Sequence, residues 1–243
     1  MSTADKLRFD HDERQRVYRH VERRGVVTRE RLEEQADMDQ RALRHHTAIL
    51  LRDGFLTEDE GGLRIGLSSG DPEQFDGPGV RTTIRPARQE DLGGIVGAIE
   101  SVVADGTDVE AESVAHVMDY EAVVLRWNEL ESRMFFVATV DHDVVGWVAV
   151  RGNELEKLAH TAELTVGVLE AYRGEGIGTR LLERAIEWAR EHGFERLYQS
   201  LPVTNTSAIE FLQARDWEVE AVRAGHYRID GEAVDEVMLA FTT

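Results

Sequence analysis

Residues 162–179 read AELTVGVLEAYRGEGIGT, an alternating apolar run followed at once by a glycine-rich turn. The alternation over Ala162–Val168 predicts a strand, and the apolar spacing from Ile177 onward predicts a helix. Three glycines fall within five positions of the turn between them: Gly174, Gly176 and Gly178. Glycines leave backbone N–H groups unshielded where a helix starts, and those groups and the helix dipole favour an anion. A pyrophosphate fits this turn, and Arg173 adds a cation beside it.

Two other phosphate-binding loops fit the turn less well. A P-loop needs Gly-Lys-Ser/Thr, but the only lysines are Lys6 and Lys157, and neither is near the turn. A dinucleotide-binding loop reads Gly-x-Gly-x-x-Gly and opens a long series of strands and helices, whereas only 65 residues follow Gly178. A tight turn that uses glycine only for close packing remains the simpler alternative.

Strand and helix patterns continue on both sides of this turn. Predicted strands cover residues 81–84, 134–140, 144–150, 162–168, 196–201, 217–222 and 233–241. Predicted helices cover residues 91–103, 114–127, 177–192 and 207–214. This order predicts a mixed sheet with helices packed on it.

The quoted stretch resembles the core motif of GNAT acetyltransferases, Gln/Arg-x-x-Gly-x-Gly/Ala. Arg173, Gly176 and Gly178 occupy its three fixed places. Asn205-x-x-Ala208 and the helix after it resemble the family's next motif. The resemblance covers residues 81–243 and implies an α+β GNAT fold, a mixed and mostly antiparallel sheet flanked by helices.

The same resemblance implies acetyl-CoA as co-substrate and an amine as acceptor. Backbone groups of Val166 and Val168 would pair with the pantetheine arm like an added strand, and the Val168 N–H would polarise the thioester carbonyl. The residues expected around the pyrophosphate are Arg173, Gly174, Glu175, Gly176, Ile177, Gly178 and Thr179. Asn205 would contact the pantetheine, or it simply caps the next helix.

Acyl transfer also needs a base, because an amine arrives protonated. Glu163 lies in the predicted cofactor strand, and many members of the family carry a glutamate in this region. The alternative is that Glu163 is one more surface carboxylate among 47 acidic residues. Glu156, His160 and His142 are the fallback candidates.

The family often supplies a tyrosine that protonates the leaving thiolate, and here the matching position is Leu212. Leucine cannot donate a proton, but a thiol with a pKa near about 8.5 can leave without full protonation. Tyr227 and Tyr172 are the candidate substitutes. This departure keeps open a second hypothesis, a transcription regulator whose GNAT domain senses acyl-CoA or a metabolite without turnover.

Residues 1–67 predict three helices followed by a hairpin, which is the order of a winged helix-turn-helix domain. Asp10, Thr28 and Asp39 are the expected helix caps. Residues 68–80 are rich in Gly, Pro, Ser and Asp and predict a linker.

The third helix begins QRALRHHT and resembles winged-helix recognition helices. Burial of Leu43 would turn a polar set outward that can bond DNA bases or phosphates: Gln40, Arg41, Arg44 and His45. His46 is expected to pack inside. The acidic hairpin tip at 58–60 argues against DNA, so a module for protein interaction or for homodimerisation is the alternative.

Composition bounds the remaining possibilities. The chain has 47 acidic and 28 basic residues, a net charge of −19, which resembles proteins of salt-loving archaea. Residues 1–68 hold 13 basic and 14 acidic residues and so lack the acidic excess. A surface that faces nucleic acid would show this balance, and chance in the composition of a small domain is the alternative. The absence of cysteine excludes disulfides and thiolate metal sites, and no metal site is expected. No apolar run is long enough to span a membrane, and no secretory signal is present, so we expect a cytoplasmic protein.

Overall fold

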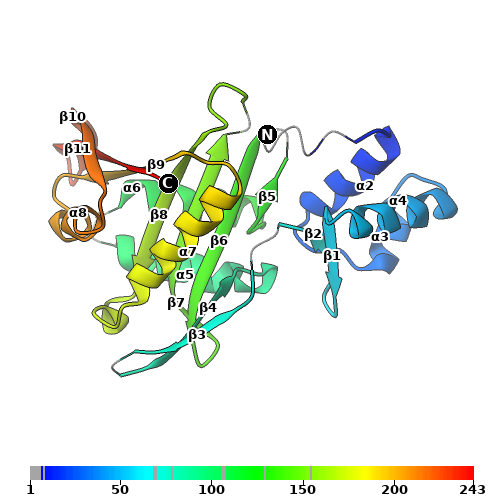
Figure 1. The fold of residues 1–243 in the computed structure, drawn as a ribbon, viewed down its shortest axis with the longest axis horizontal. Coiled ribbons are helices and arrows are strands. Elements are labelled where there is room, and N and C mark those ends of the chain that lie inside the picture. The colour runs from blue at the N-terminus through cyan, green and yellow to red at the C-terminus, as the bar shows by residue number, and fades with distance from the viewer. Residues whose placement is uncertain are drawn as a thin grey trace.

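The computed structural model describes residues 7, 9–67, 70–77, 79–104, 108–128, 130–153 and 155–243. Figure 1 shows a small N-terminal unit of helices and a hairpin beside a larger unit built on a twisted sheet. In the part of the chain that is described, the larger sheet has nine strands and the hairpin has two.

The N-terminal unit follows the expected order of elements. It consists of α2 (Asp12–Glu22), α3 (Arg29–Gln35), α4 (Gln40–Arg52), β1 (Leu56–Asp59) and β2 (Gly62–Ile65). Thr28 and Asp39 cap α3 and α4 through their side-chain oxygens, as predicted. The first cap prediction was wrong, because α2 begins after His11 and has no side-chain cap.

The large sheet runs in the order β10-β11-β9-β8-β7-β6-β4-β3, and β5 pairs with β6 at the side of this path. Its strands are β3 (Glu73–Asp76), β4 (Arg81–Pro86), β5 (Arg126–Trp127), β6 (Glu131–Val140), β7 (Asp143–Asn153), β8 (Thr161–Val168), β9 (Arg196–Pro202), β10 (Glu218–Ile229) and β11 (Glu232–Thr242). Among the described strands only β8 and β9 pair in parallel. The sheet is therefore mixed and mostly antiparallel, as the sequence predicted.

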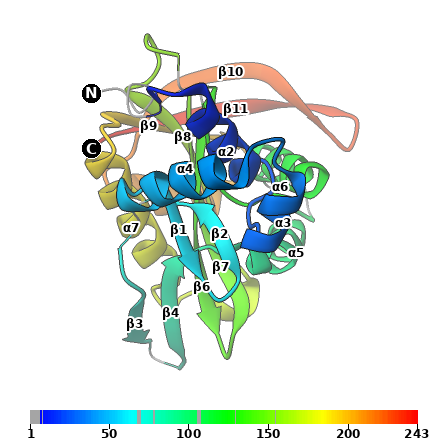
Figure 2. The ribbon, with the colours of Figure 1, turned by 90° about the vertical axis from the view of Figure 1, so that its right-hand side faces the viewer.

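Helices cover both faces of this sheet (Figures 1 and 2). One face carries α7 (Ile177–Glu191), and the other carries α5 (Leu92–Val103) and α6 (Val109–Glu121). The short α8 (Thr206–Gln213) follows β9, and single turns of 3-10 helix lie at Gln89–Asp91 and Glu170–Tyr172. Each face has its own buried cluster: Leu164 and Leu181 belong to the α7 side, and Trp147 and Ile99 to the α5 side.

Two sequence predictions are corrected by the fold. The helix predicted at 114–127 begins at Val109, because the Asp108 carboxylate accepts the N–H of Ala111, and it ends where Ala122 adopts φ 53°. Its predicted last turn instead contains β5, which pairs with β6. The predicted linker, residues 68–80, includes β3, an edge strand paired with β4, while residues 68, 69 and 78 lie outside the described part.

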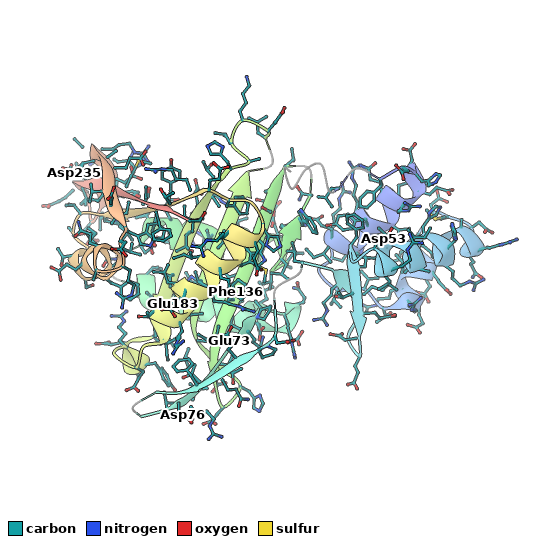
Figure 3. All side chains as sticks on the ribbon, in the orientation of Figure 1. Asp53, Glu73, Asp76, Phe136, Glu183 and Asp235 are labelled. Carbon is teal, nitrogen blue, oxygen red and sulfur yellow. The ribbon has the colours of Figure 1, made fainter. Side chains whose placement is uncertain are left out.

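Arg184 on α7 fixes this edge strand to the large unit. Its guanidinium donates to the Glu73 carboxylate at 2.9 Å and lies 5.4 Å from the centre of the Phe136 ring. Figure 3 labels both partners, Glu73 on β3 and Phe136 on β6, close to α7. The segment that joins the two units is therefore anchored to the large sheet.

The two units share a buried boundary. The Tyr18 hydroxyl donates to the Trp127 carbonyl at 2.7 Å, and the Phe55 and Trp127 rings lie 6.4 Å apart. The buried Glu22 carboxylate accepts from Asn128 at 2.9 Å and from Arg126 at 3.3 Å. These contacts hold the C-terminal end of α2 against β5.

Candidate functional site

The sheet opens between β8 and β9. The two strands pair only where Thr161–Glu163 lie beside Arg196–Tyr198, although both continue beyond that point. The Leu169 N–H donates to the Val145 carbonyl on β7. Along a strand, the backbone N–H and C=O groups of successive residues point alternately to one neighbouring strand and to the other. The backbone groups of Val166 and Val168 therefore point away from β7, into the opening.

The glycine turn lies at the end of this opening. Gly174 and Gly176 have φ values of 82° and 84°, a region that favours glycine. Beyond the adjoining residues of the chain, no atom lies within 4 Å of where a Cβ would be at either position. Gly176 is the N-cap of α7 and provides no side-chain cap, so the first-turn N–H groups of α7 face this space. The predicted strand, turn and helix are confirmed.

Two arginines lie beside the turn. The Arg173 Nε donates to the Val168 carbonyl at 3.0 Å, which leaves its charge at the start of the loop. The Arg215 guanidinium donates to the Thr179 hydroxyl at 2.7 Å and stacks 3.8 Å above the Phe211 ring. Sequence reasoning missed Arg215, because it follows α8 and no local motif links it to α7. Both cations suit a pyrophosphate.

Glu175 brings a negative charge into the same loop, but its carboxylate is held elsewhere. It accepts the backbone N–H of Gly79 at 2.9 Å, in the turn between β3 and β4. Glu175 therefore offers an anion its backbone, while its side chain joins the loop to the edge of the sheet.

On the other face of β8 lies a cleft of about 1030 Å³. Strand register places five of its lining residues in one row across β5, β6, β7, β8 and β9: Arg126, Arg133, Arg151, Glu163 and Tyr198. The opening and the cleft therefore meet at the point on β8 where Glu163 and Tyr198 end the parallel pairing.

Glu163 is exposed and forms an ion pair with Arg151, whose Nε lies 3.1 Å from the carboxylate. Glu110, on the first turn of α6, lines the same cleft. Burial raises the pKa of Glu110, and the charge of Glu163 raises it further. From the sequence, Glu110 could either attract an amine or belong to a solvated acidic face, and its place in the cleft lining favours the first of these roles.

Asp108, next to Glu110, is buried at the start of α6. Burial raises its pKa to about 7. Its low exposure, 5%, leaves it as the cap of α6 and keeps its carboxyl away from an acceptor.

Both tyrosines that could substitute for Leu212 have other contacts. Leu212 itself is fully buried in the α7-side core. The Tyr227 hydroxyl donates to the buried Glu236 at 3.3 Å, and burial followed by the charge of Glu236 raises the Tyr227 pKa. Tyr172 packs against the α7-side core.

Other predicted residues lie outside the cleft. Glu156, His160 and His142 are exposed and do not line it. The Asn205 side chain caps α8 by accepting the Ala208 N–H at 3.2 Å, as expected, and its contact with the pantetheine stays a prediction.

On α4 the expected polar set is exposed: Gln40, Arg41, Arg44 and His45. His46 is buried as expected. At the hairpin tip Glu58 forms an ion pair with Arg29, which offsets part of the negative charge that argued against DNA.

Neither a membrane span nor a metal cluster is found in the described residues. Their helices are too short or too polar to cross a bilayer, and they contain no group of three or more metal-ligating side chains.

Comparison with known proteins identifies one family. The model of the acetyltransferase (GNAT) family matches residues 87–217, more than half of the chain. The N-alpha-acetyltransferase of Sulfurisphaera tokodaii is 33% identical over 129 residues, which are 49% of this chain and 70% of that protein. The N-alpha-acetyltransferase of Saccharolobus solfataricus is 33% identical over 107 residues, 40% of this chain and 64% of that protein.

Solved structures share the fold. The yncA protein of Salmonella typhimurium, solved with its cofactor acetyl-CoA, has a TM-score of 0.55 at 19% identity and covers 66% of this chain and 93% of its own. The ribosomal-protein-alanine N-acetyltransferase of Brucella melitensis has a TM-score of 0.51 at 24% identity. The match covers 66% of this chain and 99% of that protein.

Proposed function

The chain belongs to the GNAT acetyltransferase family, and we propose that it transfers the acetyl group of acetyl-CoA, the co-substrate of that family, to an amine held beside Glu163. The observation that carries this proposal is the opening between β8 and β9, which ends at the uncapped start of α7. The same point of β8 borders the cleft on the opposite face.

The residues present fit acetyl-CoA. The space above Gly174 and Gly176 suits a pyrophosphate, which the first-turn N–H groups of α7, Arg173 and Arg215 would hold. A strand rises about 3.3 Å per residue, so Glu163 lies roughly 16 Å along β8 from Val168. The pantetheine arm is of this order, and the thioester would therefore lie toward Glu163.

The direction of the pantetheine arm along β8 determines which backbone N–H lies beside the thioester carbonyl. The resemblance assigned the Val168 N–H to the thioester carbonyl. Val166 is two residues nearer to Glu163, and we assign its N–H to that carbonyl instead. Val168 would then bond the arm nearer the pyrophosphate, where its own carbonyl is held by Arg173.

In the reaction the amine nitrogen attacks the thioester carbon, the C–S bond breaks, and the thiolate leaves. The proton of the amine passes to Glu163, which Arg151 positions. Glu110 lines the same cleft, and in its ionised form it would favour the incoming ammonium group. Leu212 has no proton to donate, so in this proposal the thiolate takes its proton from water.

The acceptor that we propose is an α-amine at the start of a peptide. Two relatives are N-alpha-acetyltransferases, and one of them shares 33% identity over 70% of its length. Release of free thiol from acetyl-CoA, measured in high salt against peptides, lysine side chains and polyamines, tests this. Preference for a polyamine would overturn the peptide assignment alone, whereas binding of acetyl-CoA without turnover on any amine would favour the sensor hypothesis.

For the N-terminal unit we propose a winged helix that binds DNA. In its described residues three helices precede a hairpin, which a bridge at Leu63 joins to Val27. Gln40, Arg41, Arg44 and His45 extend from α4. Loss of DNA binding on combining Arg41→Ala with Arg44→Ala would support this, and a homodimer with no DNA affinity would show the dimerisation alternative.

A further inference from the structure

The N-terminal unit forms one end of the acceptor cleft. Glu22 and Arg23, the last residues around α2, line the cleft together with Arg126 and Asn128 of the large unit. The matched family model begins at residue 87, so Glu22 and Arg23 lie outside the family domain, whereas Arg126 and Asn128 lie within it. We propose that the acceptor is a polypeptide that crosses the sheet from Glu163 and is recognised at its far end by Arg23. This inference rests on the proposed acetyltransferase function.

The dimensions of the cleft set the length of the acceptor. Glu163 and Arg126 lie in one register row on β8 and β5, three strand spacings apart. At about 4.8 Å per spacing this is roughly 14 Å. An extended chain covers about 3.3–3.6 Å per residue, so roughly four residue steps span it. With the first residue at Glu163, the fifth reaches the wall formed by α2.

Most charges at this far end are already paired. Arg126 bonds Glu22 at 3.3 Å and Glu121 at 3.2 Å, and Arg133 bonds Glu121 at 2.7 Å. Glu22 and Arg133 are buried, so these pairs form a fixed floor. Rearranging these ion pairs around a ligand would cost free energy, because breaking a buried pair leaves an uncompensated charge.

Arg23 differs from these arginines. It is exposed at the C-cap of α2, and within the described part of the chain it takes part in no ion pair. Its guanidinium is therefore the cation that can meet an acidic group of the acceptor. Leu130 and Leu158, 80% and 45% exposed, line the same cleft and suit apolar side chains of the peptide between its two ends.

The experiment uses the full chain and free-N-terminus peptides of two to seven residues with either Asp or Lys at the fifth position. We expect KM to fall as length increases to five residues and to be about three- to tenfold lower for Asp than for Lys. Arg23→Glu should invert the Asp/Lys preference while leaving the KM for acetyl-CoA and for dipeptides unchanged. Arg31→Glu, the same charge change at an exposed residue of α3 outside the cleft, should keep the wild-type preference.

The outcomes separate this inference from the proposed function. Turnover with no dependence on length or on the fifth residue would overturn the inference and leave the acetyltransferase intact. Calorimetric binding of the same peptides to the protein saturated with coenzyme A is a readout independent of turnover. A length-independent affinity there would also overturn the inference, and absence of both turnover and peptide binding would overturn both proposals.

Discussion

The two sides of β8 are built in different ways. On the opening side, the candidate coenzyme site consists of backbone groups at Val166 and Val168 and the glycine turn that follows them. On the cleft side, the candidate acceptor site consists of charged side chains from both units, such as Glu163 and Glu22. Backbone geometry can be encoded in one short stretch, whereas the cleft depends on how distant elements assemble.

Loss of the proposed base should have the largest effect. Glu163→Gln keeps the shape of the side chain but cannot accept a proton, so we expect kcat to fall about 100-fold, with a small change in the KM for acetyl-CoA. Steady-state thiol release measures both constants. Glu156→Gln, an exposed glutamate outside the cleft, is the control. An unchanged kcat in Glu163→Gln would move the role of base to another group, with Glu110 the first to test.

Replacing a glycine of the turn should weaken acetyl-CoA binding on the opening side of β8. Gly176→Ala places a methyl group in the space above the loop and strains a residue with φ 84°. We expect the Kd for acetyl-CoA, measured by calorimetry, to rise about tenfold. Gly193→Ala is a matched control, because Gly193 has φ 85°, also has no neighbour within 4 Å of a Cβ, and lies after the opposite end of α7. Equal rises in Kd for both variants would contradict the loop assignment.

The opening side of β8 depends on local backbone geometry and the cleft side on distant elements, so the sequence predicts the opening side better. The strand, turn and helix from Thr161 to Glu191 are local patterns, and the structure has them within one residue of the predicted ends. The helix predicted at 114–127 exists, but its predicted end was wrong, because the apolar spacing continues past Ala122, where the backbone turns and β5 forms by pairing with β6. Propensity cannot anticipate a strand that exists only through its partner.

The site residues divide in the same manner. The candidate glycines can be predicted because their spacing is itself the signal, and the candidate base Glu163 because it lies in the adjoining strand. The candidates Arg215 and Arg23 could not be predicted, since each reaches its proposed site from an element far away in the chain. Asp108 could be recognised as a helix cap, but its burial follows from the packing of α6.

Asp108, at the start of α6, should make the thermal stability of the protein depend on pH, and this effect is expected to be smaller than the two above. Burial raises its pKa from 3.8 to about 7, so the stability that it contributes is fully present below the unfolded pKa and is lost as pH rises through about 7. Asparagine caps a helix as well as aspartate does. We therefore expect Asp108→Asn to gain Tm relative to wild type between about pH 5 and pH 8, by about 3 °C at the upper end.

Calorimetric unfolding across this range measures the difference. The matched control is Asp39→Asn, the exposed cap of α4. A Tm difference that does not change with pH would show that the Asp108 carboxyl ionises without cost in the folded protein.

The smallest expected effect tests whether the two units act together. Tyr18→Phe removes the hydroxyl that donates to the Trp127 carbonyl and leaves both rings in place, so stability should fall by about 1 kcal/mol. Because α2 also closes the cleft, KM for five-residue peptides should rise while KM for dipeptides stays the same. Tyr120→Phe, at a side chain 92% exposed, should change neither. A stability loss with no change in peptide KM would mean that the boundary holds the units together without shaping the acceptor site.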